Sequence, residues 1–261
     1  MRQSALLAVV LACLAISAAG MADEFRDYPE FRYASGLPGG TNGVTPDGHI
    51  GFAGAFQLNI PVGYTPGWGN FMLTAGSAAI NGGFPDGMWG NDHNGTLTLG
   101  WGMFNEHRAW LSIMGTGKGT KSLEQVYNLQ VEVVPESDKW PAISVGVVDM
   151  LDRRASTLDR PLEGSARSFY AVATREGGTP EHPLYYTLGF GNGRFNNRPF
   201  GGVSYQAADR WQVFAEYDGW VGNVGGAYDV VSSREWHGIL GLSLVDFDRI
   251  DLTLSVTKTD F

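Results

Sequence analysis

The chain is poor in charge and has a single cysteine, and both shortages exclude classes of protein. Charged residues make up 17% of it, whereas soluble proteins carry about 25%. Cys13 lies in the leader described below, so the mature chain has neither a disulfide nor a thiolate metal ligand. No segment after that leader approaches the roughly 18 consecutive apolar residues that indicate a transmembrane helix. The formal net charge of −9 also disfavours nucleic acid as a partner, because phosphate binding needs a basic surface.

Residues 1–22 have the order of features that predicts a signal peptide. Arg2 supplies positive charge, Ala5 to Ile16 form an apolar run, and small residues follow before an acidic pair. The apolar run is shorter than the about 20 residues that a membrane-spanning helix needs. We therefore expect export and cleavage after Ala19 or Ala22. The alternative is a retained N-terminal anchor helix.

The rest of the chain repeats a pattern that is typical of β-strands, with short stretches separated by Gly, Pro, Asn and Asp. The clearest stretch is 49–60, in which Ile50, Phe52, Phe56 and Leu58 share one face. Because side chains alternate between the two faces of a strand, each such stretch has one apolar wall and one small or polar wall. Six further stretches show the pattern clearly and six show it weakly. They are 96–103, 126–133, 184–191, 210–218, 236–244 and 250–256, and 70–80, 107–116, 140–150, 167–175, 199–206 and 226–232.

These thirteen candidates predict an all-β fold, an antiparallel transmembrane β-barrel. Bacterial single-chain barrels use an even number of strands, so we predict 12 strands, with 14 as the next choice. We expect residues 23–48 to form an N-terminal polar segment and residues 49–261 to form the barrel. Aromatic residues near the ends of the stretches, such as Trp211 and Trp236, fit membrane interfaces. The alternative is a soluble periplasmic β-domain, because alternation alone does not distinguish lipid from a dry core.

The polar residues on the second face of these strands are the candidate functional residues. We expect them to face the lumen of the barrel, and they are Asn128, Gln130, Glu132, Arg210, Gln212, Glu216 and Asp218. Charges that face a lumen usually pair across it and close it. The alternative is that they line a cation-leaning or sugar-binding passage.

The sequence contains near misses to three kinds of catalytic or cofactor motif. Gly115–Ser122 departs from a phosphate-binding loop, because Thr120 stands where that motif has glycine. Gly189–Gly193 resembles a dinucleotide-binding loop, but the helix that such a loop requires is not predicted after it. The five histidines show no i, i+4 pair that would indicate a metal site. Asp92–Gly95 lacks the serine that outer-membrane phospholipases carry beside His and Asn-Gly. We therefore predict no enzyme, no cofactor and no metal, with a lipid hydrolase as the alternative.

Five motifs follow one another between about residue 140 and residue 230. They are Trp140–Asp149, Phe169–Thr174, Tyr186–Arg194, Pro199–Tyr205 and Phe214–Gly219. Their order resembles the YjbH-like family of exopolysaccharide-associated outer-membrane β-barrels. That family has a P-x-[AI]-x-x-G-x-x-D strand, then Y-x-V-[AS], T-L-G-x-G-x-G-R, F-G-G-x-x-Y and A-E-Y-D. The resemblance covers roughly a third of the chain, and it implies a role in exopolysaccharide production or export without catalytic residues to carry over.

The combined prediction is an outer-membrane β-barrel that supports exopolysaccharide production or export, or the structure of the envelope. A small porin-like channel for ions or sugars is the first alternative, and the lipid hydrolase is the second. The expected partners are outer-membrane lipid and lipopolysaccharide, the barrel assembly machinery and polysaccharide export components.

Overall fold

A computed structural model describes residues 36–79, 93–118, 124–152, 167–233, 235–247 and 249–259. The predicted signal peptide and its cleavage sites lie outside the described residues. Within the described ranges, no helix is long and apolar enough to cross a membrane.

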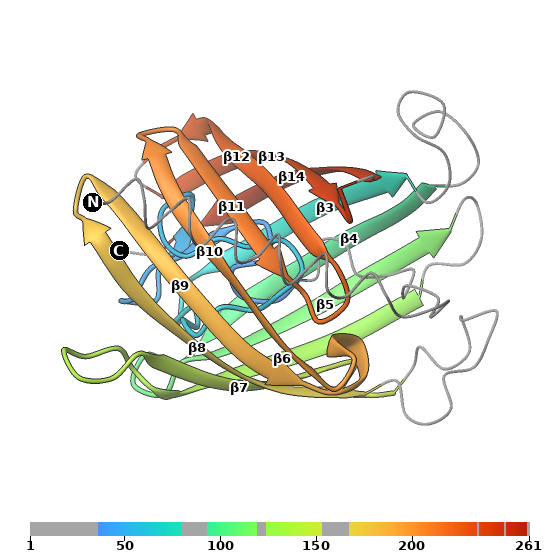
Figure 1. Ribbon diagram of the computed structural model, residues 1–261, viewed down its shortest axis with the longest axis horizontal. Coiled ribbons are helices and arrows are strands. Elements are labelled where there is room, and N and C mark those ends of the chain that lie inside the picture. Colours follow the sequence, from blue (N-terminus) through green and yellow to red (C-terminus); the bar gives the residue numbers. More distant parts are fainter. Residues whose placement is uncertain are drawn as a thin grey trace.

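Twelve strands close into one antiparallel barrel (Figure 1). Each strand pairs with the next along the chain, and the last strand pairs with the first, so β14 completes the wall against β3. This confirms the predicted all-β fold and the predicted strand number. The strands are β3 Phe71–Ala79, β4 His93–Met103, β5 Ala109–Lys118, β6 Glu124–Val134, β7 Ala142–Val148, β8 Ser168–Thr179, β9 His182–Gly191, β10 Arg198–Ala208, β11 Trp211–Tyr217, β12 Gly222–Ser232, β13 Trp236–Val245 and β14 Arg249–Lys258.

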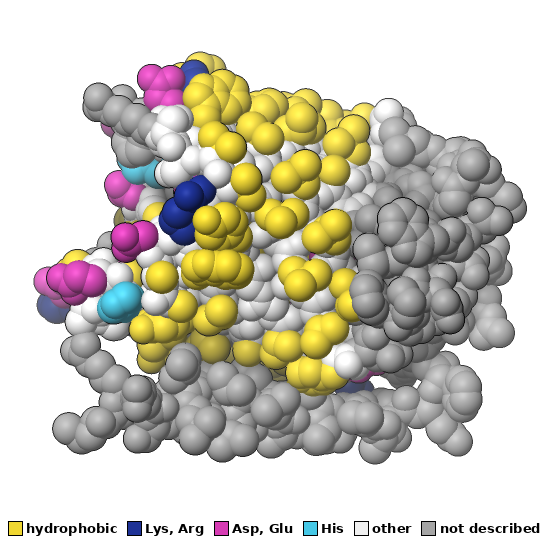
Figure 2. Space-filling model, turned by 90° about the horizontal axis from the view of Figure 1, so that it is seen from above, with side chains coloured by type: hydrophobic (Ala, Val, Ile, Leu, Met, Phe, Trp, Pro, Cys, Tyr) yellow, Lys and Arg dark blue, Asp and Glu magenta, His cyan; other side chains and the backbone are white. Residues whose placement is uncertain are grey.

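The outside of the wall is apolar. Large apolar side chains from nearly every strand are exposed, and they cover much of the face in Figure 2. Contact between such a surface and water is unfavourable, whereas contact with the hydrocarbon of a bilayer is favourable. A closed barrel also leaves no unpaired strand edge in the lipid. The barrel is therefore a transmembrane barrel of the outer-membrane type. Its exposed residues include Leu97, Leu99, Val133, Val145, Leu188, Val213, Leu240, Leu242, Leu244, Leu252, Leu254 and Val256.

The two ends of the barrel differ. Short connections such as 180–181 and 209–210 lie at one end, here called the turn end. The strand ends at Ala79, His93, Val148 and Ser168, which flank the longest stretches of sequence between strands, lie at the other end, here called the loop end. Outer-membrane barrels place short turns in the periplasm and long loops outside the cell. Exposed aromatic side chains lie near both ends as interfacial girdles would. Those at the turn end are Trp68, Phe104, Trp140, Trp211 and Trp236, and those at the loop end are Phe169, Phe190 and Phe247.

The prediction of a barrel strand over 49–60 is wrong. That stretch forms only the two-residue strand β2 Ile50–Gly51, which pairs with β1 Gly43–Val44, and the barrel begins at Phe71 rather than at residue 49. Its apolar side chains are buried inside the barrel instead of facing lipid. The other twelve candidate stretches all correspond to barrel strands.

Residues 36–70, here called the lumen segment, run inside the barrel before the first wall strand (Figure 1). Three buried apolar clusters form where this segment meets inward-facing wall residues. The first cluster joins Phe52, Phe56 and Leu58 to Phe214 and Ile239 among others. The second joins Leu37 and Ile60 to Met114, Val126, Tyr170, Phe195 and Phe200 among others, and the third joins Val44, Ile50, Ala55, Val62 and Tyr64 to Met72, Trp110, Ala142 and Tyr185. The core of the protein therefore lies in the lumen.

A charge on the outer wall tests the assignment of that surface to lipid. Leu254 lies in the middle of β14 and is 55% exposed. We expect Leu254→Arg to lower the free energy of unfolding in lipid vesicles by about 2–4 kcal/mol, the cost of Arg near the bilayer midplane. Leu254→Val is the matched control, and urea titration followed by heat-modifiable gel mobility is the measurement. Equal stability of both variants would contradict a lipid-facing wall.

Candidate functional site

The candidate site is the contact between the lumen segment and the polar inner wall, because four of the seven predicted residues bind the segment directly. Inward side chains from β5 to β11 bind backbone groups of the segment along most of its length. Part of the segment's backbone pairs with itself, as between Val44 and Ala55 and between Gly39 and Gln57, and the groups bound by the wall lie outside regular strands. A buried backbone N–H or C=O needs a hydrogen bond, so the wall supplies what a sheet would otherwise supply.

Glu216 of β11 holds the part of the lumen segment that lies nearest the loop end. Its two carboxylate oxygens accept hydrogen bonds from the backbone N–H groups of Leu58 and Asn59, both at 2.9 Å. Asn223 Nδ2 also donates to Glu216, at 3.0 Å. The Asn59 carbonyl accepts a hydrogen bond from Arg194 at 3.2 Å. Glu216 and Arg194, both buried, thus bind the same short stretch of backbone. The carboxylate accepts from its N–H groups, and the guanidinium donates to its carbonyl group.

Gln130 of β6 holds the returning part of the segment. Its amide Nε2 donates to the carbonyl oxygens of Val62 at 3.0 Å and Tyr64 at 3.3 Å, and to Thr65 Oγ1 at 2.8 Å. Tyr170 donates its hydroxyl to Gln130 Oε1 at 2.8 Å, which fixes the orientation of the amide. The side chain of Gln130 is therefore fully engaged.

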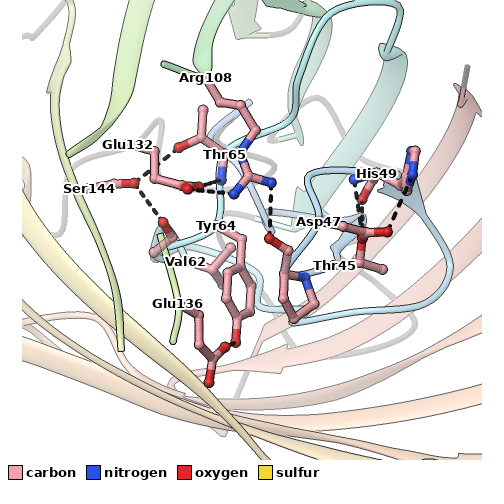
Figure 3. A network of polar contacts seen from close by, with 12 residues as sticks. Thr45, Asp47, His49, Val62, Tyr64, Thr65, Arg108, Glu132, Glu136 and Ser144 are labelled. Carbon is pink, nitrogen blue, oxygen red and sulfur yellow. Dashed lines mark hydrogen bonds and ion pairs between the residues drawn. The ribbon is translucent and has the colours of Figure 1, made fainter. Parts of the chain in front are cut away.

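An ion pair secures the segment near the turn end (Figure 3). Arg108 Nη2 lies 2.5 Å from Glu132 Oε1, and both side chains are buried. Glu132 also accepts a hydrogen bond from the Thr65 backbone N–H at 3.1 Å, and Arg108 donates to the Pro46 carbonyl at 3.0 Å. Each charge thus has its counter-charge and a backbone partner, which is the condition for stable burial of ions.

Tyr64 adds a contact at the same mouth. Its hydroxyl donates to Glu136, which lies just after β6 (Figure 3). Burial raises the pKa of the Tyr64 hydroxyl, and the neighbouring Glu136 carboxylate raises it further. The hydroxyl therefore stays protonated and remains a donor at neutral pH.

Small hydroxyl side chains and two glycines let the segment approach the wall closely. Ser144 donates to the Gly63 carbonyl at 2.6 Å, and Thr174 accepts from the Gly63 N–H at 2.7 Å. A Cβ on Gly63 would lie 2.6 Å from backbone atoms of β7 and β8. A Cβ on Gly102 of β4 would lie 1.8 Å from the Gly67 carbonyl oxygen. Only glycine fits at either position.

Further wall residues bind the segment one at a time. These contacts are Trp110 Nε1 to the Gly36 carbonyl at 3.0 Å, Gln212 Nε2 to the Gly54 carbonyl at 3.0 Å, and the Phe56 N–H to Ser204 Oγ at 3.0 Å.

The structure places the predicted lumen residues as follows. Gln130, Glu132, Gln212 and Glu216 bind the lumen segment directly, as described above. Asn128 accepts the Asp149 N–H at 3.2 Å at the loop end of β7.

Asp218 and Arg210 lie beyond the contact. Asp218 accepts the N–H groups of Trp220 and Val221 and shapes the turn between β11 and β12. Arg210 does not face the lumen, because it lies in the turn before β11, where strand alternation does not apply. It is exposed, and it donates to the carbonyls of Asp229 and Val230, both at 2.7 Å.

Sequence analysis missed the lumen segment itself, although the wall carried a signal for it. Val126, Tyr185 and Phe214 lie on the face that is otherwise small or polar, and the structure buries all three against the segment. Apolar residues that face a water-filled lumen would be unfavourable. Their presence indicates that protein fills the lumen.

The arrangement described above binds a segment of the protein's own chain. The polar groups named above bind backbone or one another. In the part of the chain that the structure describes, no group of three or more His, Cys, Asp or Glu side chains is placed to hold a metal ion.

Comparison with solved structures finds other barrels at low identity. The outer membrane protein Omp33 of Acinetobacter baumannii is similar over 73% of this chain and 98% of its own, with 10% identity and a TM-score of 0.43. The KdgM porin in complex with disordered oligogalacturonate is similar over 74% of this chain and 99% of its own, with 10% identity and a TM-score of 0.44. No protein-family model and no curated protein matches the chain. The resemblance to the YjbH-like family therefore stays a prediction.

Loss of the Glu216 carboxylate should loosen the lumen segment. We expect Glu216→Ala to leave two buried N–H groups unpaired and to lower the free energy of unfolding by about 2–4 kcal/mol. Glu181→Ala, in the exposed turn between β8 and β9, should leave stability unchanged. Urea unfolding in detergent compares the two variants. Equal midpoints would mean that Glu216 does not hold the segment.

A methyl group at Gly102 should displace the segment where it joins the wall. We expect Gly102→Ala to expose residues around Gly67 to protease or to hydrogen exchange, because the new Cβ would overlap backbone. Gly238→Ala on β13 is the control, since its nearest neighbour is a Val231 side-chain atom at 3.3 Å. Identical protection of residues 36–70 in the two variants would refute the close approach.

Proposed function

We propose that this protein is an outer-membrane barrel closed by its own lumen segment, and that it supports exopolysaccharide production or export or the structure of the envelope. The observation that carries the proposal is the filled lumen. Buried hydrogen bonds and three apolar clusters join the segment to the wall, which is what a closed barrel requires and what an open pore lacks. The role is non-enzymatic, because the polar groups named at the site serve to hold chain.

The exopolysaccharide part of the proposal rests on the five motifs between residues 140 and 230. They occupy β7 to β11 and the connections between these strands. Several of their residues bind the lumen segment, and these are Ser144, Thr174, Arg194, Ser204 and Glu216. The motifs therefore belong to the part of the wall that binds the lumen segment. Polysaccharide export components are the partners that the resemblance favours, with lipopolysaccharide and lipid around the wall.

Conductance tests the closure. We expect the purified protein in planar bilayers to show no sustained open-pore current, because the lumen segment blocks the path. The double variant Glu216→Ala, Gln130→Ala should show intermittent current, since two of the polar contacts that hold the segment are removed and parts of it can shift locally. The Glu181→Ala variant is the control and should be silent. A steady ohmic current through the unmodified protein would overturn the closed barrel and favour the porin-like alternative.

Deletion in the parent bacterium tests the role. We expect the deletion strain to secrete less polysaccharide and to admit small hydrophilic solutes at the normal rate. Re-expression of the unmodified protein should restore secretion. Unchanged polysaccharide together with reduced solute uptake would refute the proposed role.

A further inference from the structure

One buried charge in the lumen is not explained by the lumen segment. Asp251 lies on β14, and its strand partners are Ser243 of β13 and Ala78 of β3. It is 0% exposed, and neither of its carboxylate oxygens has a hydrogen-bond partner among the described residues. The three ion pairs between described residues also leave it out.

This contrasts with the other inward carboxylates. Glu132 is paired with Arg108, Asp229 lies 3.2 Å from His237, and Glu216 accepts backbone N–H groups. A carboxylate that is removed from water needs a counter-charge or donors, and its burial is otherwise strongly unfavourable. A native buried group without a partner calls for an unseen ion or water.

Two described neighbours of Asp251 on the inner face carry oxygen ligands. Ser243 lies directly across from it on β13, and Thr253 lies two residues along β14 on the same inward face. Hydroxyl and carboxylate oxygens are the ligands that hard cations prefer. A single carboxylate balances one positive charge.

We propose that a small monovalent cation binds at Asp251, on the lumen side of the seam where β14 closes the barrel against β3. The carboxylate supplies the charge, and the hydroxyls of Ser243 and Thr253 complete the oxygen shell. The ion neutralises a buried carboxylate whose two oxygens have no hydrogen-bond partner among the described residues, and it stabilises the pairing of the last strand with the first. This site is independent of the proposed role in the envelope.

Thermal unfolding in detergent tests the site, at constant ionic strength and with N-methyl-D-glucamine chloride as the reference salt. We expect 100 mM sodium or potassium chloride to raise the midpoint of unfolding by about 3–6 °C, as binding to the folded state requires. Asp251→Asn should abolish this rise. Asp229→Asn is the matched control, because that carboxylate already has His237 as its partner, and it should keep the rise.

Three outcomes would overturn the proposal. The first is an equal midpoint in all three salts, which would mean that Asp251 is buried in its protonated form. The second is a response to calcium chloride alone, which would exclude a monovalent ion. The third is an equal rise in Asp251→Asn, which would place the ion elsewhere. Should Asp251→Asn fail to fold, Ser243→Ala and Thr253→Val provide the test, because each should reduce the rise.

Discussion

The constraint on which the structure depends is that a closed barrel turns about half of its wall side chains inward, where they need partners. Here those side chains include Glu132, Gln130 and Glu216, all buried. An unpaired polar group in such a place costs about 1–3 kcal/mol, and a charge costs more. The backbone of the lumen segment supplies these partners. The wall side chains in turn supply hydrogen bonds to a segment that has almost no regular secondary structure.

Strand alternation predicted the wall well because it reports a physical difference between two faces. Leu97, Leu188 and Leu254 face outward and their neighbours along each strand face inward, as strand alternation predicted. The same logic failed at 49–60, where Phe52 and Phe56 also alternate but pack inside the lumen. Alternation shows that one face is apolar, and it does not show whether lipid or protein covers that face. The requirement for an even strand number was the one constraint that could reject a thirteenth strand, although it could not say which candidate to remove.

The inner site was predictable only in part, for a related reason. Residues within strands, such as Gln130 and Glu216, kept their predicted direction because pleating fixes it. Arg210 did not, because it precedes the first residue of β11 and its direction follows from the turn. The pairing of neighbouring strands could not predict that the lumen segment packs against the inner wall. It depends on contacts between residues more than a hundred positions apart, such as Leu58 and Glu216.

Opening the lumen would expose more than the polar contacts. Val126, Tyr185 and Phe214 would lose their apolar neighbours if the segment left, and so would Phe56 and Ile60 on the segment. Burying one such side chain contributes about 1.5–3 kcal/mol, so five of them together are comparable to the whole stability of an ordinary domain, about 5–15 kcal/mol. Withdrawal of the whole segment is therefore unfolding rather than gating. A barrel built in this way depends on its filling for stability, which supports the proposal of a closed barrel that meets its partners outside the lumen.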